Sequence, residues 1–172
     1  NRIHTLADIG SGAGFPSVPL RILYPHIRVT IIDSLNKRIQ FLQHLTESLG
    51  LQDTNCVHSR AEDAARMSQY RDGFDLVTAR AVARMSVLNE LCLPFVKVGS
   101  VFAAMKGADP EDELTEAEYS LTKLNGKLER VERFQLPVEE AKRSIVLVKK
   151  QAPTPKLYPR KAGTPLKNPL LR

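Results

Sequence analysis

A glycine-rich turn follows the first apolar segment of the chain, in the sequence DIGSGAGFP (residues 8–16). The residues before it, IHTLADIG (3–10), have the apolar character of a buried strand that ends at Gly10. Pro16 suits the first turn of a helix, so the stretch predicts a strand, a tight turn and a helix in succession. Glycines in such a turn let a ligand approach the backbone closely. The N-terminus of the following helix favours an anionic group.

Strands and helices are predicted to alternate along the rest of the chain. Apolar, β-branched runs predict strands at 27–33, 55–58, 74–79 and 100–105, with helices at 34–49, 86–96 and from 109 to about 125. Two more strands, 128–136 and 144–150, follow without a full helix between them. This order predicts an α/β fold, with a mostly parallel sheet, helices on both faces and an antiparallel edge hairpin. Ligands of such sheets bind beyond the carboxyl ends of the strands, at the switch point after the first strand.

Composition limits the class of protein. The chain has 172 residues, 42% of them hydrophobic, and a net charge of +6. No apolar run approaches the roughly 18 residues that a membrane span needs. The two cysteines, Cys56 and Cys92, form no disulfide or zinc motif, so we expect a cytoplasmic protein without a metal or a membrane partner. We also expect a monomer.

The positive charge is concentrated in residues 151–172, which we call the C-terminal segment. It holds five cations and no acid, which leaves residues 1–150 with a net charge of +1. It also holds five of the eleven prolines, which favour an extended, solvated chain. We therefore expect residues 1–150 to form the folded domain and the C-terminal segment to be a basic, proline-rich tail. Composition leaves open whether this tail binds a polyanion or is a solubilising, disordered end.

Asp33 ends the second predicted strand, 23 residues after Gly10. A carboxylate there can accept hydrogen bonds from both hydroxyls of a ribose, so the pair of features indicates a ligand that contains a nucleoside. It does not by itself separate a nicotinamide dinucleotide from S-adenosylmethionine. Phe15 stands where a dinucleotide-binding turn has its third glycine and would crowd a pyrophosphate, which favours S-adenosylmethionine. Asp8 is predicted to bind either the ammonium group of that ligand or the backbone of the turn.

Five separated motifs together resemble one family, the bacterial small-subunit ribosomal RNA methyltransferase G family. They are DIGSGAGFP (8–16), DSLNKR (33–38), RAE (60–62), TARAVAR (78–84) and YPRKAGTP (158–165). The resemblance implies the Rossmann-like fold of S-adenosylmethionine-dependent methyltransferases and methylation at N7 of one guanine in 16S ribosomal RNA. The partner is then 16S ribosomal RNA or the small ribosomal subunit. Family members carry a helical segment before the first strand. The chain begins at Asn1 rather than Met, and we expect it to lack that segment.

The resemblance also implies which residues bind the cofactor: Gly10, Phe15, Ala61, Glu62 and Arg80. With the glycine turn and the second strand, the predicted set becomes Gly10, Gly12, Gly14, Phe15, Asp33, Ala61, Glu62 and Arg80. Glu62 also has the spacing to complete a helix capping box with Ser59. Arg80 is expected to face the cofactor carboxylate or an RNA phosphate, and the alternative is a surface ion pair.

Guanine N7 has a free lone pair at neutral pH, so its methylation requires no general base. None of the four histidines follows the fourth predicted strand, and we assign no catalytic residue. The predicted RNA-binding residues are Arg84, Lys106, Lys156, Arg160 and Lys161. For Arg84 and Lys106 a solvated surface position is the alternative. The rival functions are a nicotinamide-dependent oxidoreductase and a ribosome-binding protein without catalysis.

Overall fold

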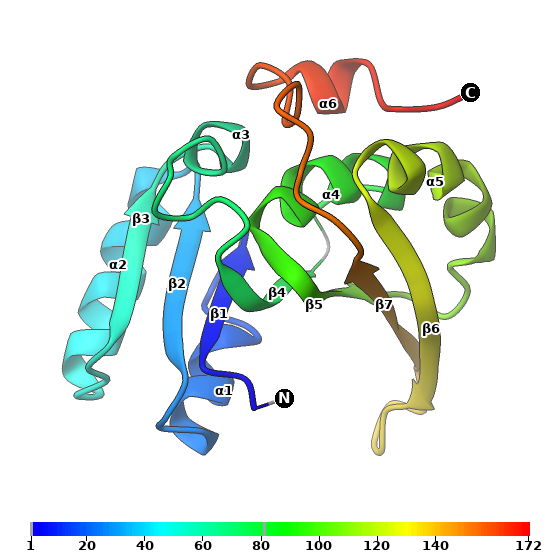
Figure 1. The fold of residues 1–172 in the computed structure, drawn as a ribbon. Coiled ribbons are helices and arrows are strands. Elements are labelled where there is room, and N and C mark those ends of the chain that lie inside the picture. Colours follow the sequence, from blue (N-terminus) through cyan, green and yellow to red (C-terminus); the bar gives the residue numbers. More distant parts are fainter. Residues whose placement is uncertain (1, 81) are drawn as a thin grey trace.

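Seven strands form one sheet in the order β3-β2-β1-β4-β5-β7-β6 (Figure 1). The computed structural model describes residues 2–80 and 82–172, so Ala81 of the TARAVAR motif lies outside the described residues. The strands are β1 (Thr5–Ile9), β2 (Arg28–Asp33), β3 (Thr54–His58), β4 (Phe74–Arg80), β5 (Val96–Lys106), β6 (Gly126–Gln135) and β7 (Lys142–Lys150). The first five are parallel, and β7 pairs antiparallel with both β5 and β6. The predicted mixed sheet with an antiparallel edge hairpin is therefore confirmed.

Helices cover both faces of the sheet. The helices are α1 (Ser17–Leu23), α2 (Asn36–Ser48), α3 (Ala61–Ala64), α4 (Met85–Cys92), α5 (Glu111–Lys123) and α6 (Thr164–Lys167), with a 3-10 turn, η1 (Leu93–Phe95), after α4. Of those that connect the strands, α1 and α2 lie on one face and α3, α4 and α5 on the other. Pro94 lies in that turn, which ends α4 earlier than predicted, and β5 accordingly begins at Val96. Among the described residues, no helix combines the length and the apolar character that crossing a membrane requires.

Each face of the sheet packs on its own hydrophobic core. In β1, Leu6 belongs to the core beneath α1 and α2, whereas Ala7 and Ile9 belong to the core beneath α3, α4 and α5. Adjacent residues of a strand point to opposite faces, so a strand that is buried on both sides is apolar at most positions, here with the fully buried Asp8 as the exception. This explains why apolar residues do not alternate with polar ones along the first strand.

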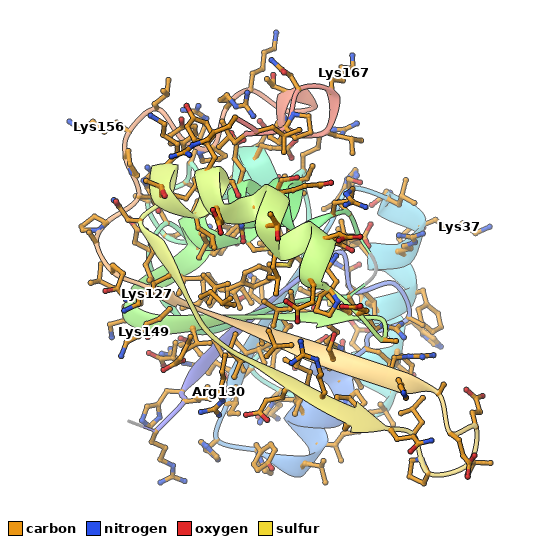
Figure 2. All side chains as sticks on the ribbon, turned by 90° about the vertical axis from the view of Figure 1, so that its right-hand side faces the viewer. Lys37, Lys127, Arg130, Lys149, Lys156 and Lys167 are labelled. Atoms are coloured by element: carbon orange, nitrogen blue, oxygen red, sulfur yellow. The ribbon has the colours of Figure 1, made fainter. Side chains whose placement is uncertain are left out.

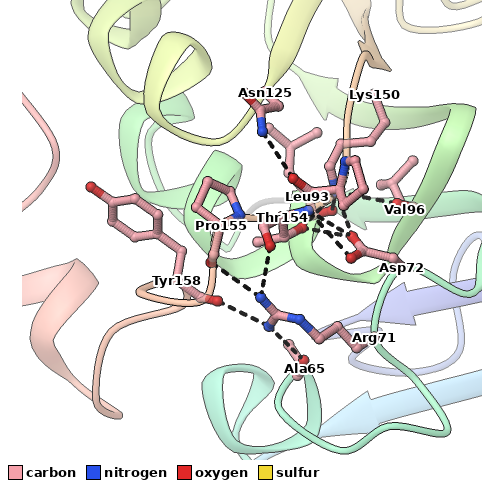
Figure 3. A network of polar contacts seen from close by, with 11 residues as sticks. Ala65, Arg71, Asp72, Leu93, Val96, Asn125, Lys150, Thr154, Pro155 and Tyr158 are labelled. Carbon is pink, nitrogen blue, oxygen red and sulfur yellow. Dashed lines mark hydrogen bonds and ion pairs between the residues drawn. The ribbon is translucent and has the colours of Figure 1, made fainter.

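The C-terminal segment is packed against the domain. It leaves β7 at Lys150, whose side chain is fully buried and donates hydrogen bonds to Asp72, at 2.7 Å, and to Thr154, at 2.6 Å (Figure 3). The guanidinium of Arg71 donates to the carbonyl oxygens of Thr154, Pro155 and Tyr158 (Figure 3). The prolines keep this stretch out of helices and strands, so its backbone carbonyls have no partners in secondary structure. The contacts with Arg71 supply hydrogen-bond donors to three of these carbonyls. The prediction of a solvated segment is therefore wrong for this stretch, since composition does not reveal the buried partners on the domain.

Beyond Tyr158 the C-terminal segment crosses α4 and reaches α3. Arg160 is held there by the carboxylate of Glu90, a residue of α4 that is fully buried. Four contacts of 2.7–3.1 Å join the two, from the backbone N–H of Arg160 and from its guanidinium. Desolvating a lone carboxylate is costly, so Arg160 offsets the burial of Glu90 and fixes the path of the C-terminal segment.

Candidate active site

A cavity of about 320 Å³ lies at the carboxyl ends of β1, β2 and β3, and we call it the first cavity. This edge of the sheet is where the switch point between β1 and β4 opens a crevice. The cavity is lined by Ile9, Gly10, Ile32, Asp33, Ser34, Arg38, Ser59, Arg60, Ala61, Glu62, Val82, Ala83, Val87, Leu91, Gly163 and Leu166. Four of the eight predicted cofactor residues are among them, namely Gly10, Asp33, Ala61 and Glu62.

Asp33 lines the first cavity and has one carboxylate oxygen without a hydrogen-bond partner among the described residues. Its side chain is buried, and Oδ1 accepts a hydrogen bond from the backbone N–H of Leu35 at 2.9 Å. Among the described residues Oδ2 has no hydrogen-bond partner, and its contact with the half-exposed guanidinium of Arg38 spans 3.5 Å. A buried carboxylate oxygen without a hydrogen bond is costly unless a ligand supplies the donor. Ribose hydroxyls are donors of this kind.

Gly10 lines the first cavity, and a side chain at this position would strain the backbone and contact Val82. Its φ is +69°, and a Cβ added there would lie 2.8 Å from Cγ2 of Val82, which lines the same cavity. Its backbone N–H donates to the carbonyl of Ile32 at 2.9 Å, which fixes the turn against β2. Glycine is therefore required both for the conformation and for the space.

Glu62 joins α3 to the C-terminal segment. Its Oε1 accepts a hydrogen bond of 2.8 Å from the backbone N–H of Gly163. The alternative of a capping box with Ser59 is wrong, because α3 begins at Ala61 with Arg60 as its N-cap and no side-chain cap hydrogen bond. The Ser59 hydroxyl donates instead to the carbonyl of Arg60.

The C-terminal segment supplies one wall of the first cavity through Gly163 and Leu166. Leu166 is 68% exposed, so its side chain is accessible to a ligand in the cavity. Neither residue was among the predicted cofactor residues. The signal available in the sequence was the motif YPRKAGTP, but nothing in it indicates that the segment folds back over α3 and α4.

The remaining predicted cofactor residues lie outside the first cavity. Gly14 has a φ of +97°, and an added Cβ would lie 2.7 Å from Val18, so it serves the packing of the turn on the core. Gly12 has nothing within 4 Å of an added Cβ.

The Arg80 guanidinium lies 5.7 Å from the centre of the Phe15 ring, a cation–π contact. The ion-pair alternative for Arg80 finds no partner within the described part of the chain.

Asp8 lies beneath the turn and does not line the first cavity. It is fully buried, and its Oδ1 accepts a hydrogen bond from the Thr78 hydroxyl at 2.9 Å. Burial raises the pKa of Asp8, and hydrogen bonds from Ser17, Ser11 and Thr78 oppose this effect. These contacts favour the interpretation that Asp8 supports the turn and the start of α1.

Two of the predicted RNA-binding cations are engaged by acids of α5. Arg84 forms a two-pronged ion pair with Glu116, at 2.9 and 3.0 Å. Lys106 is nearly buried and donates to the Ala83 carbonyl and to Glu113, both at 2.7 Å. Partial burial alone would raise the pKa of Glu113, but the hydrogen bond and charge of Lys106 lower it below its ordinary value. Lys106 therefore ties the segment after β4 to α5.

In the C-terminal segment, Lys156 and Lys161 are exposed, whereas Arg160 is paired with Glu90. Figure 2 shows Lys156 and Lys167 projecting from the molecule, and Lys127 and Lys149 at the start of β6 and the end of β7. None of these four lysines forms an ion pair with another described residue. The exposed lysines of the C-terminal segment are thus available to an external polyanion.

Comparisons with known proteins agree with this geometry. A family model described as rRNA small subunit methyltransferase G matches residues 1–146. The Ribosomal RNA small subunit methyltransferase G of Brevibacillus brevis is 54% identical over 171 residues, covering 99% of this chain and 72% of the relative. That of Bacillus subtilis is 51% identical, covering 99% of this chain and 71% of the relative.

Solved structures agree on the fold. A SAM-dependent methyltransferase from Methanosarcina mazei superimposes with a TM-score of 0.66 at 16% identity, covering 88% of this chain and 94% of the other. A mutant of MtNAS in complex with S-adenosylmethionine gives a TM-score of 0.64 at 17% identity, covering 88% and 56%.

Proposed function

The chain belongs to the rRNA small subunit methyltransferase G family, and on that basis we propose that it transfers a methyl group from S-adenosylmethionine to N7 of one guanine in 16S ribosomal RNA. The observation that carries the proposal is the carboxylate of Asp33. Its buried Oδ2 lacks a hydrogen-bond partner among the described residues, and Asp33 lines the first cavity. A nucleoside ligand would satisfy that oxygen through its ribose.

The residues present fit S-adenosylmethionine. Asp33 would hold the ribose, and the backbone at Gly10 would lie against the ligand, where a Cβ would intrude. Ala61 and Glu62 follow β3 and would border the adenine, with Leu166 covering it.

The chain would act by binding and orienting its two substrates. S-adenosylmethionine supplies a methyl group bonded to a positively charged sulfur. Guanine N7 carries a lone pair and no proton, so no residue of this chain has to remove one. Well-oriented reactants can gain effective molarities of roughly 10⁵–10⁸ M, so alignment alone provides a large part of such a rate enhancement.

The RNA would be held by exposed cations and by the mouth of the site. Lys156 and Lys161 are suited to phosphate contacts, whereas Arg84, Lys106 and Arg160 would act mainly by fixing the protein's own structure. We propose that residues 1–150 form the methyltransferase domain and that the C-terminal segment completes it. We further propose a cytoplasmic monomer acting on 16S ribosomal RNA within the small ribosomal subunit.

The test uses small ribosomal subunits that lack the modification, with methyl-labelled S-adenosylmethionine. We expect the label at one guanine of 16S ribosomal RNA, as 7-methylguanine in mass spectrometry of nuclease digests. Binding of the subunits without transfer of label would favour the non-catalytic rival. Calorimetry with S-adenosylhomocysteine and NAD tests the rival function of a nicotinamide-dependent oxidoreductase. We expect S-adenosylhomocysteine to bind and NAD not to bind.

A further inference from the structure

A second cavity, of about 570 Å³, lies on the other side of the segment that follows β4. It is lined by Arg80, Met105, Lys106, Gly107, Glu113, Phe134, Leu136 and Arg143. The Nζ of Lys106, from this cavity, donates to the carbonyl of Ala83, which lines the first cavity, at 2.7 Å. The two cavities therefore share a wall, and a ligand in one lies next to a ligand in the other.

The second cavity combines a flat apolar surface with two exposed positive charges. Phe134 is 43% exposed, and the half-buried Met105 and Leu136 lie beside it in the lining. An exposed phenylalanine is a stacking surface for a nucleobase. Arg80 and Arg143 are exposed, and neither guanidinium forms an ion pair with a described residue. Arginine is well suited to bind phosphate.

Glu113 carries an acceptor oxygen without a partner among the described residues. Its Oε2 accepts hydrogen bonds from Lys106 Nζ at 2.7 Å and from the backbone N–H of Met85 at 2.9 Å. Within the described part of the chain, Oε1 accepts no hydrogen bond, and the side chain is 24% exposed. The Watson–Crick edge of guanine carries two donors, N1–H and the 2-amino group, and a carboxylate oxygen can accept from them. Adenine and the pyrimidines do not present this pair of donors.

We propose that the second cavity holds the target guanosine, with its base on Phe134, its Watson–Crick edge toward Oε1 of Glu113, and its flanking phosphates at Arg80 and Arg143. The proposal rests on the proposed function, because it assigns the methyl acceptor of that reaction. Contact through the Watson–Crick edge leaves N7, on the Hoogsteen edge of the purine, without a contact to Glu113. The ion pair between Lys106 and Glu113 then not only ties the segment after β4 to α5 but also holds the Glu113 carboxylate in position for the base.

The first experiment replaces the stacking surface and the phosphate contact. Phe134→Ala and Arg143→Ala are compared with Leu128→Ala, on the same strand as Phe134 and 36% exposed, and with Lys149→Ala, on the same strand as Arg143. Neither control residue lines the second cavity. Loss of base stacking predicts a fall in kcat/KM for small subunits of about fivefold to a hundredfold for Phe134→Ala. Both controls should retain the wild-type kcat/KM, and all four variants should bind S-adenosylhomocysteine with the wild-type Kd.

The outcomes separate this proposal from the proposed function. If wild-type protein methylates guanine N7 and Phe134→Ala matches Leu128→Ala in kcat/KM, the second cavity is not the guanosine site. If wild-type protein transfers no methyl group to guanine, the proposed function itself is wrong. Should Phe134→Ala fail to fold, Phe134→Leu keeps the apolar volume but loses the ring, and the same fall in kcat/KM is expected of it.

A second experiment tests Glu113 by a readout that a purely structural role would not change. Small subunits reconstituted with inosine at the target position lack the 2-amino group. Since a hydrogen bond to a charged group is lost, we expect wild-type kcat/KM to fall about tenfold on this substrate. In Glu113→Gln the same inosine substitution should cost clearly less. An equal inosine penalty in wild type and Glu113→Gln would overturn the assignment of Glu113.

Discussion

Glu62 accepts a hydrogen bond of 2.8 Å from the backbone N–H of Gly163, a residue 101 positions further along the chain. Both residues line the first cavity. The contact closes that cavity with residues that follow all seven strands of the sheet. The affinity for the cofactor should therefore depend on how firmly the C-terminal segment is attached to α3 and α4.

Replacing Arg160 tests this dependence. Arg160→Ala leaves the buried carboxylate of Glu90 without its charged partner, and removal of one member of a buried pair typically costs about 3–5 kcal/mol. Because the Arg160 side chain is 20% exposed, we expect a loss toward the lower limit, about 3 kcal/mol, in the free energy of unfolding in urea. We also expect weaker binding of S-adenosylhomocysteine in calorimetry. Lys167→Ala removes an exposed cation from the same segment and should change neither quantity.

Replacing Asp33 tests the ribose contact. Asp33→Asn keeps the shape of the side chain and an oxygen for the Leu35 N–H but removes the charge. Hydrogen bonds to charged groups are worth about 1.5–3 kcal/mol, so the Kd for S-adenosylhomocysteine should rise roughly tenfold to a hundredfold. Asp53→Asn, at an exposed position before β3, is the matched control. An unchanged Kd for Asp33→Asn would contradict the placement of the ribose.

The glycine turn allows a comparison between two positions of similar backbone conformation. Gly10 and Gly12 have φ values of +69° and +63°, but only an alanine at position 10 would meet a side chain, that of Val82. Gly12→Ala should cost about 1–2 kcal/mol of unfolding free energy, from the left-handed conformation alone. Gly10→Ala should cost more and should also weaken binding of S-adenosylhomocysteine, and adding Val82→Ala should restore part of the loss. Equal effects at both positions would mean that the contact with Val82 does not matter.

Salt dependence of RNA binding tests the exposed lysines. Each phosphate contact contributes about 0.7–0.9 to the slope of log K against log salt. Lys156→Ala combined with Lys161→Ala should therefore reduce the slope for small subunits by roughly 1.4–1.8. The control combines Lys127→Ala with Lys149→Ala. These two residues lie opposite each other on the neighbouring strands β6 and β7 (Figure 2). If both double variants reduce the slope equally, the charge of the C-terminal segment has no special role.

Stability in acid tests Asp75. Partial burial by itself raises the pKa of Asp75, but hydrogen bonds from His4 and Thr5 and the charge of Lys97 outweigh it and lower the pKa. A carboxyl group whose pKa is lowered on folding stabilises the protein above its unfolded-state pKa, and this contribution disappears as the pH falls through the folded-state pKa. The difference in unfolding free energy between wild type and Asp75→Asn should thus be larger at pH 7 than near pH 3. A difference that does not change with pH would contradict this.

The sequence was sufficient to predict the sheet, because its signals are local. The apolar run before Gly10 and the β-branched run of β2 mark strands by their own composition, and the lack of a full helix between 136 and 144 marks a hairpin. The place of Asp33 in the lining of the first cavity could be predicted, because the position at the end of the second strand follows directly from that order. The boundaries of α4 and β5 were missed by a few residues, since a 3-10 turn at Pro94 has no distinct pattern.

The sequence was not sufficient to predict the wall formed by the C-terminal segment. Its prolines and cations favour a solvated tail, and its attachment depends on Glu90, Asp72 and Arg71, which lie far away in the chain and carry no mark of their role. Likewise, Arg84 pairs with Glu116 and Lys106 with Glu113, both on α5. In the sequence these two acids look like ordinary acidic residues near the start of a helix, and nothing indicates their partners. Long-range pairing of charges decided both outcomes.

The buried lysine at the end of β7 separates the chain into a part that builds the sheet and a part that completes the ligand site. During synthesis all seven strands leave the ribosome before Gly163 and Leu166 do, so the sheet can assemble while the site is still open. A message that terminates early, between positions 151 and 162, would then yield a protein with the whole sheet but without the wall that Gly163 and Leu166 give to its ligand site.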